Sequence, residues 1–520
     1  MSQGTGQIAQ AASVVSGATF LSRILGYIRD MVIAHGFGTG TAADAFFVAF
    51  RIPNMLRELL GEGALSAAFI PVFAQVRAER GKETALRVAT TTFWVLGVLL
   101  TITCLVGIVL SPWVVRLIGP GFWEIPEKFA LTVKLTRMMF PYLLFAGLSA
   151  LMMGTLNSLG HFALPALSPA LLNISIITAA ILLGPKLGEP VLALAVGVLF
   201  GGVMQVALQV PPLVTRGMSF IPQGSPADPA ILRIGHLMGP RAIGLGVTQL
   251  HVLVTTILAT LVGGGAVSTL YYAFRLVHLP IGMVGVAVAT AAFPVMAARV
   301  AARSIGEVHH ACMASLRLIL FLTLPALVGL VVFRREIVSL LFERGAFSAQ
   351  ATQGTAAVIL AYCVGLIFFV VNRLLVSTFY AFQDTASPVK AGMIGVGIGT
   401  GLSLVLMGPM GVPGLALATS LGSAVSCWCL GRWLVRYLGP WQWRDLLPPL
   451  AKMGWAAGVM AVTAVLSRSF WPPLAASSWS ARALVFTIEG MLTLCAYYGV
   501  TRILGLPEAS GLREKLRGGT

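Results

Sequence analysis

The sequence predicts an all-α integral membrane protein of fourteen transmembrane helices, in which two parallel six-helix repeats form two lobes around a central cavity and two more helices follow. Three observations support this fold class. Of the 520 residues, 57% are hydrophobic and 10% are charged, whereas soluble proteins contain about 25% charged residues. Apolar runs of roughly 20 residues recur along the chain, which suits membrane helices rather than the short alternating strands of a barrel. The two halves of the sequence can also be aligned with each other in a common register.

Each predicted helix corresponds to one apolar run. Their expected limits are 9–37, 42–76, 89–118, 130–157, 164–184, 190–214, 239–263, 266–298, 312–333, 354–382, 387–408, 412–436, 447–468 and 481–504. Several runs are longer than a straight crossing requires, so we expect tilts, kinks or projections beyond the bilayer.

The charged loops predict the orientation of the chain. With fourteen spans, most basic loops and the basic C-terminal tail fall on one face, which the positive-inside rule identifies as cytoplasmic. Both termini are therefore predicted in the cytoplasm. The opposite face is expected to hold short links and mixed-charge loops, such as the one with Glu124, Glu127 and Lys128. The loop expected at 334–344 is an exception, because it holds three arginines.

The net charge of +17 follows from this orientation and does not indicate nucleic-acid binding. No basic run with interleaved aromatic residues is present.

An internal repeat is visible at an offset of 224 residues. The tripeptide Ala49-Phe50-Arg51 matches 273–275, and after one gap AAFIPVFAQVRA (67–78) matches TAAFPVMAARVA (290–301). Because each half holds six spans, the copies have the same orientation, as in parallel-repeat transporters. We expect an N-lobe at 1–220, a C-lobe at 221–440, and a last segment at 441–520 with two helices and a cytoplasmic tail.

The first span contains unusual charge in the stretch SRILGYIRD (22–30). Arg23 and Arg29 are six residues apart and would face differently on an ideal helix. Gly26 lies between them, and a bend there could re-aim them. Arg23 and Asp30 are seven apart and share a face, so Asp30 is a candidate counter-ion in this region.

The second span repeats this pattern. Arg51 and Arg57 flank Pro53, which is a candidate hinge like Gly26. The acidic residue Glu62 follows between Gly61 and Gly63, and a backbone break at this depth is tolerated only where it faces protein or a wet cavity.

Arg275 is the repeat mate of Arg51. Two structural alternatives apply to these arginines. They could snorkel from helix ends to the interface, or they could pair with acids such as Asp44. Neither alternative accounts for the whole set of five arginines, because these arginines outnumber the acids available. The five are Arg23, Arg29, Arg51, Arg57 and Arg275. Excess arginine in a wet cleft suits an anionic ligand, and the guanidinium fork suits a diphosphate.

Other polar residues are weaker indicators of function than these arginines. Gln249, Asn173 and Asn372 are expected to hydrogen-bond between helices. Asp384 is expected at a helix end, with an ion-ligand role as the weaker alternative. The sequence shows no catalytic set, no metal-ligand spacing and no nucleotide-binding loop, so we expect neither an enzyme nor a cofactor.

The motifs resemble those of the MurJ (MviN) family of bacterial lipid II flippases, within the multidrug/oligosaccharidyl-lipid/polysaccharide exporter superfamily. The resemblance rests on SRILGYIRD, on ADAFFVAFRIPNMLRELLGEGALSAAFIPVF (43–73), and on PGF (120–122), YYAFRL (271–276), LFERGAFS (341–348) and QDTASPVK (383–390). It covers essentially the whole chain.

The resemblance implies a multi-pass protein of the bacterial cytoplasmic membrane that supports peptidoglycan synthesis. Its implied substrate is lipid II, the undecaprenyl-diphosphate-linked precursor, and its implied mechanism is alternating access. The family's functional arginines correspond to Arg23, Arg29, Arg57 and Arg275, and its acidic positions to Asp30, Asp44 and Glu62. The last two helices would form a groove for the lipid tail.

Two other functions remain as alternatives: a scaffold of cell-wall assembly that transports nothing, and an exporter of another anionic glycolipid or of a drug. Expected partners are lipid II and membrane lipids. The flippase and scaffold hypotheses would add the cell-wall synthesis machinery.

Overall fold

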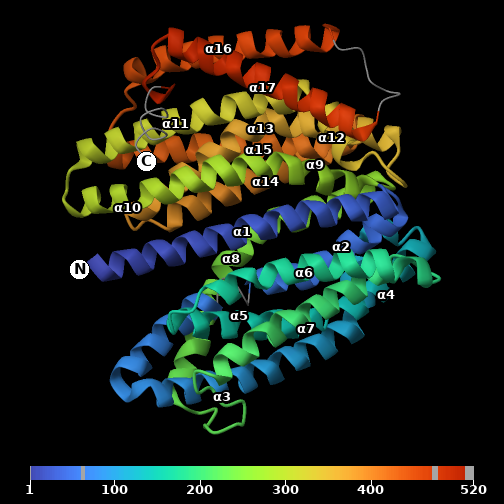
Figure 1. The fold of residues 1–520 in the computed structure, drawn as a ribbon, viewed down its shortest axis with the longest axis vertical. Coiled ribbons are helices and arrows are strands. Elements are labelled where there is room, and N and C mark those ends of the chain that lie inside the picture. Colours follow the sequence, from blue (N-terminus) through green and yellow to red (C-terminus); the bar gives the residue numbers. More distant parts are fainter. Residues whose placement is uncertain (1, 60–64, 471–477, 510–520) are drawn as a thin grey trace. The chain divides into compact units, whose positions relative to one another are not determined.

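The computed structural model describes residues 2–59, 65–470 and 478–509, and within these ranges all regular elements are helical (Figure 1). Eleven helical stretches in them are long and apolar enough to cross a membrane, and Gln249–Val262 is a shorter apolar one. The predicted class of an all-α membrane protein is confirmed. The count of fourteen spans stays a prediction.

The chain forms two compact units. Unit 1 comprises Met1–Ser268 and Gly345–Phe347. Its elements are α1 (Ser2–Phe37), α2 (Thr41–Arg57), α3 (Ser66–Ile118), η2 (Pro120–Phe122), α4 (Pro126–Met139), α5 (Tyr142–Ser158), α6 (Ala163–Leu182), η3 (Gly184–Lys186), α7 (Leu192–Val214), α8 (Pro229–Val262) and the first residues of α9 (Ala266–Pro280). Helix α6 packs against α1 and α7, and α5 packs against α3 and α7.

Unit 2 comprises Thr269–Arg344 and Ser348–Thr520. After α9 its elements are the π-helix η4 (Ile281–Val286), α10 (Ala287–Ala301), α11 (Ile305–Val332), α12 (Arg334–Phe342), α13 (Ala349–Ala381), α14 (Ala386–Met410), α15 (Val412–Leu438), α16 (Trp443–Phe470) and α17 (Trp479–Ile503). Helix α15 packs against α13 and α14, while α16 and α17 pack together and α16 also contacts α11.

The boundary between the second and third predicted spans differs from expectation. The residues expected to connect them, 77–88, are helical and belong to α3, apart from one break at Gly81. Gly81 has φ of +85°, a conformation that glycine adopts without the steric cost of a side chain. A single glycine therefore takes the place of the predicted loop.

Two other predicted spans are interrupted. The span expected at 130–157 is divided into α4 and α5 at Phe140 and Pro141, because proline cannot donate the hydrogen bond that would continue α4. The span expected at 266–298 contains η4 directly after Pro280. A run of apolar residues does not reveal such changes in hydrogen-bond register.

The prediction of a loop at 334–344 is wrong, because most of it forms the helix α12. Val338 and Phe342, one turn apart, are fully buried on the same face. The exceptional arginines have structural partners: Arg334 donates to the carbonyl of Val331, and Arg344 donates to that of Leu340. They satisfy carbonyls at helix ends that lack an intrahelical donor.

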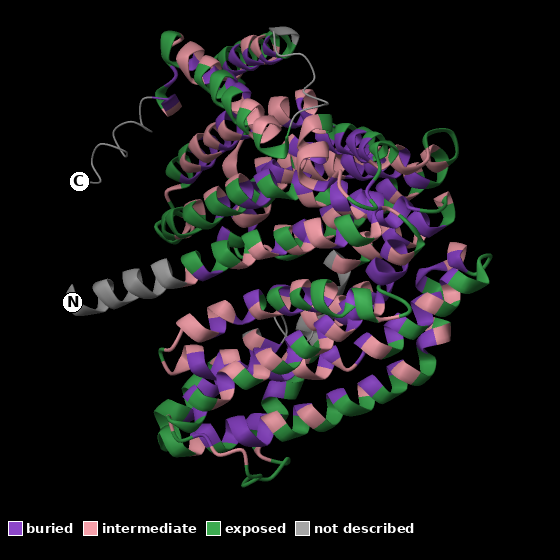
Figure 2. Ribbon diagram, turned by 45° about the vertical axis from the view of Figure 1, so that its right-hand side comes forward, coloured by how far each residue is buried: buried purple, intermediate pink, exposed green. Residues whose placement is uncertain are grey.

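Exposed and buried residues lie beside each other along the helices (Figure 2). On α3, for example, Val98, Leu99, Ile102, Leu105 and Val109 are each more than half exposed. A water-soluble protein rarely presents such a continuous apolar face. It suits contact with lipid chains.

Candidate functional site

Arg29 on α1 is held by its chain neighbour and by a helix far away in sequence. Its Nη2 lies 2.7 Å from Oδ1 of Asp30, and its Nη1 donates to Oδ1 of Asn173 on α6 at 3.2 Å. The amide of Asn173 also donates to the carbonyl of Ser22 at 3.1 Å. Asp30 is fully buried and the Arg29 side chain is 11% exposed, so this guanidinium has a defined orientation.

Arg23 is in a different environment from Arg29. It is exposed, and it has no polar partner among the described residues. Asp30, the candidate counter-ion of this region, forms its ion pair with Arg29. Helix α1 also runs unbroken through Gly26, without the unwound turn that could re-aim these side chains.

A second polar cluster lies where α2 ends. Arg57 Nε donates to Oδ1 of Asn54 at 3.2 Å, and its Nη2 is 3.7 Å from Oε1 of Glu58. The two oxygens of Glu58 accept from the amides of Asn54 and of Gln249 on α8. Arg57 and Glu58 are 20% and 35% exposed, so the cluster is half-buried.

The backbone near this cluster is irregular after Pro53. Residues 58–59 adopt π-helical geometry, and the amide of Glu58 donates to the carbonyls of both Asn54 and Met55. Arg51, on the other side of Pro53, is half-buried. The predicted site residues Gly61, Glu62 and Gly63 lie outside the described residues.

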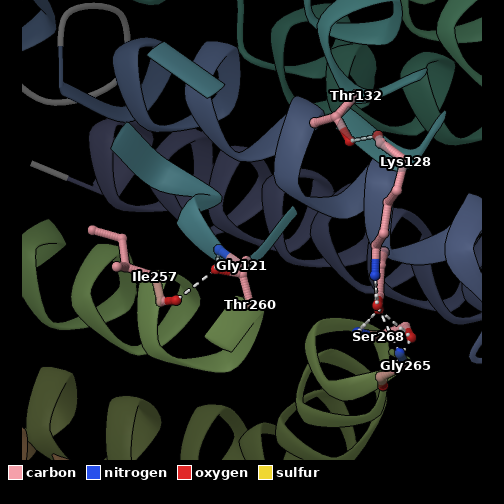
Figure 3. A network of polar contacts seen from close by, with 8 residues as sticks. Gly121, Lys128, Thr132, Ile257, Thr260, Gly265 and Ser268 are labelled. Atoms are coloured by element: carbon pink, nitrogen blue, oxygen red, sulfur yellow. Dashed lines mark hydrogen bonds and ion pairs between the residues drawn. The ribbon is translucent and has the colours of Figure 1, made fainter. Parts of the chain in front are cut away.

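Asp44 in the first turn of α2 is the centre of a buried network. Figure 3 labels three of its partners, Lys128, Gly265 and Ser268. Its carboxylate accepts hydrogen bonds from Lys128 Nζ at 2.7 Å, from the Gly265 amide at 2.7 Å, and from the amide and hydroxyl of Ser268 at 2.8 and 2.7 Å. Gly265 and Ser268 flank the start of α9. Asp44 thus caps the N-terminus of a helix more than 200 residues away, where a negative charge is favourable.

Lys128 was expected among solvated loop charges and that expectation is wrong. It lies on α4, its side chain is 1% exposed, and its Nζ is 4.0 Å from the centre of the Phe122 ring. Its place three residues into α4, after an apolar PGF turn, gave no clear sign of burial. A single lysine in an apparent loop is ordinarily read as solvated.

Arg275 lies in unit 2, near the end of α9. It is half-buried, and the adjoining Tyr272 is fully buried against the ring of Phe342. The π-helix η4 begins six residues later, after Pro280. An arginine followed by a proline and then by π-helical geometry therefore occurs both in α2 and in α9, and π-helical turns are frequent at functional sites.

Sequence reasoning missed Arg373. It occupies an apolar membrane-spanning helix, α13, where it is exposed and has no polar partner among the described residues. Its side chain lies beside Gly285 of η4. The signal was available, because an arginine within the predicted span 354–382 is costly in hydrocarbon.

Asp384 is a helix-end residue, as expected. It accepts from the amide and hydroxyl of Ser387 at 2.9 and 2.6 Å and from the Tyr437 hydroxyl at 3.1 Å. Burial acts to raise its pKa, but these hydrogen bonds outweigh burial and hold the pKa below its ordinary value. Within the described residues, no group of three or more acidic, histidine or cysteine side chains is arranged to hold a metal ion.

The acids beside the arginines determine which guanidinium groups already have a partner and which do not. Arg29 and Arg57 each have one adjacent carboxylate and one amide partner, whereas Arg23 and Arg373 have no polar partner in the described chain. Such groups can hold an anion by charge-assisted hydrogen bonds.

Comparisons with known proteins agree with this chemistry. The family model described as "Lipid II flippase MurJ" matches residues 33–485. Probable lipid II flippases MurJ from Vibrio cholerae and Rhizobium meliloti are each 35% identical to the chain. They align with 82% and 98% of it, and with 83% and 96% of their own lengths.

Solved structures share the fold. A structure described as "Lipid II flippase MurJ, inward closed conformation" has a TM-score of 0.77 and 24% identity, over 93% of this chain and 98% of that one. An inward-facing multidrug resistance transporter of the MATE family has a TM-score of 0.68 and 15% identity, over 81% of this chain and 97% of that one.

Proposed function

This chain belongs to the MurJ family of lipid II flippases, and from that membership we propose that it moves lipid II from the inner to the outer leaflet of the bacterial cytoplasmic membrane. The observation that carries the proposal is the family match over residues 33–485, together with a 35% identical relative aligned over 98% of the chain. The family is one of transporters rather than enzymes. Supply of the lipid-linked precursor supports peptidoglycan synthesis outside the membrane.

The substrate's diphosphate is proposed to bind Arg23, Arg29, Arg57 and Arg275, with Arg51 contributing positive charge. Arg23 has no described polar partner, so it can bind an anion without first breaking an ion pair. Asp30 and Glu58 balance the charges of Arg29 and Arg57 when no substrate is bound. Paired guanidinium forks match the oxygen geometry of a diphosphate better than lysines would.

We propose that these helices form two parallel six-helix repeats, with both termini cytoplasmic and α16 and α17 receiving the lipid tail. Two observations support this. Asp44 and Ser268, which are hydrogen-bonded, are repeat mates separated by 224 positions. Gly121 and Gly345, one residue away from the offset of 223 that holds after the gap, occupy corresponding turns.

The two glycines make equivalent contacts. A methyl group on Gly121, in the turn before α4, would overlap the carbonyl oxygen of Thr260 near the end of α8. A methyl group on Gly345, in the turn before α13, would overlap the carbonyl oxygen of His35 near the end of α1. The turn before α4 thus approaches α8, which precedes α9, and the turn before α13 approaches α1, which precedes α2. A two-fold axis relating the proposed repeats would produce this reciprocal pair of contacts.

Alternating access is the proposed mechanism, and Asp44 is the proposed gating residue on the outer side. Its cap on α9 connects α2 of the first repeat with the helix that carries Arg275. Release of this cap would free α9 from α2. A ligand can then shift the cycle toward the open or the closed state only if it binds that state more tightly than the other.

Complementation in cells depleted of their own flippase tests the role of the arginines. We expect Arg29→Ala and Arg275→Ala to abolish growth, because each removes a charge from the proposed diphosphate site. Arg335→Ala, which changes an exposed arginine on α12, should support growth as the unchanged chain does.

The alternatives predict other results. A scaffold would tolerate Arg29→Ala and Arg275→Ala when both variants are present at normal levels in the membrane. An exporter of drugs would bind its substrate without competition from a diphosphate-bearing lipid. Either result would contradict the proposed substrate.

A further inference from the structure

The Asp44 network contains one cation whose role the proposed transport cycle leaves unexplained. Three of the four hydrogen bonds to the Asp44 carboxylate come from Gly265 and Ser268, and these donors are neutral. Only Lys128 brings a full positive charge. Both side chains of this ion pair are almost completely buried, at 0% and 1% exposure.

Burial makes the charge of Lys128 necessary. A buried carboxylate without a counter-charge loses its hydration and is driven toward its neutral form. Removal of one partner from a buried ion pair is correspondingly costly. The ring of Phe122, 4.0 Å from Nζ, adds a cation–π contact that holds the ammonium in this position.

No other charged side chain substitutes for Lys128 among the described residues around the carboxylate. The elements there are the end of α1 with its loop to α2, then α2 itself, η2, α4, the end of α8 and the start of α9. His35, at the end of α1, is exposed and lies against Gly345. Glu124 and Glu127, next to η2 and in α4, are exposed and carry the same sign as Asp44. The segments 257–262 and 265–268 contain no ionisable side chain.

We infer that Lys128 is a positioning residue for the gate: its ammonium supplies the counter-charge that allows the Asp44 carboxylate to cap α9 while both side chains are buried in the closed arrangement. When α9 withdraws, Asp44 gains access to water and no longer depends on the lysine. Lys128 thus favours closure. The inference rests on the proposed gating role of Asp44 but not on the identity of the substrate.

The test measures how often the contact opens, without transport. In a chain whose native cysteines are replaced, Ala266→Cys places a thiol at a residue that is 2% exposed beside the cap. Its rate of labelling by a maleimide in detergent is divided by the rate for Gly264→Cys, which is exposed and has open space around it. Both rates are measured at the same pH, so the ratio removes the intrinsic reactivity of the thiol.

We expect this ratio to be low when Lys128 is present, because the closed arrangement buries the thiol. In Lys128→Met the Asp44 carboxylate is buried without a counter-charge, which disfavours closure. The labelling ratio should therefore increase by about tenfold or more over that of the parent.

Two controls separate this role from general packing. Asp44→Asn combined with Lys128→Met lacks both charges, so its labelling ratio should be lower than that of Lys128→Met alone. Lys134→Met removes a lysine from the same helix, whose Nζ is likewise 2.7 Å from a carboxylate but half-exposed, and should behave like the parent. An unchanged ratio in Lys128→Met, or a double variant that labels as fast as Lys128→Met alone, would overturn the inference.

Discussion

At the scale of residues, the sequence indicated which side chains are unusual but not which atoms they bind. Arg23, Arg29, Arg57 and Arg275 stand out because charge is costly in apolar runs. The helical spacing indicated Asp30 as a counter-ion in this region without deciding which arginine it pairs with, and it pairs with its neighbour Arg29. Side-chain rotamers decide such a choice, and residue spacing does not contain them. The partnership with Asn173, 144 positions away, depends on how α1 and α6 pack.

A pH effect is expected at His161, in the turn between α5 and α6. Its Nδ1 is 3.0 Å from Arg216 Nη2, and burial, aided by the charge of Arg216, holds its pKa below the ordinary value of 6.5. The folded chain therefore favours the neutral ring, which can accept from the arginine. This stabilisation is complete above pH 6.5 and is lost as the pH falls through the lower pKa of the folded state.

Thermal unfolding checks this expectation. The difference in Tm between the parent and His161→Phe should be largest at pH 8 and should shrink toward pH 5. His310→Phe, which changes an exposed histidine, should show no such trend. A difference that grows as the pH falls would mean that the charged ring is the stabilised form.

At the scale of elements, apolar runs predicted where helices occur but not where they break. The π-helix after Pro280 and the kink at Gly81 change the hydrogen-bonding pattern without changing hydrophobicity. The helix α12 was predicted as a loop because it lies between two longer apolar runs. Arg334 and Arg344 in fact bind carbonyls at helix ends, a use that depends on the three-dimensional position of those carbonyls.

The turn before α13 provides a prediction at this scale. Gly345 has φ of +57° and lies against the His35 carbonyl, and the amide of Ala346 donates to that carbonyl at 2.8 Å. Gly345→Ala should cost about 1–2 kcal/mol for the left-handed backbone and about 1–3 kcal/mol more for the overlap.

Gly160 is the matched control for this change. It has φ of +80° but open space around it, so Gly160→Ala should cost only the backbone contribution. The measurement is the decrease in Tm of each purified variant. Equal decreases would show that the approach of Gly345 to His35 contributes nothing to stability.

At the scale of the whole molecule, composition and the motifs from SRILGYIRD to QDTASPVK were enough to predict a membrane transporter and its family. They were informative because hydrophobicity fixes the solvent of the chain, and because an excess of arginine in such a solvent calls for an anion. The structure adds the connection of α2, α4 and α9 through Asp44 and Lys128, which links residues that no local pattern relates.

The central claim is that this chain moves lipid II across the membrane, and translocation by the purified protein tests it most directly. Lipid II is placed in the inner leaflet of proteoliposomes, and its appearance at the outer leaflet is followed with a membrane-impermeant probe of the head group. We predict faster appearance than in protein-free vesicles, and a return to the protein-free rate with Arg29→Ala or Arg275→Ala. A parent protein that is correctly folded and yet gives the protein-free rate would contradict the account.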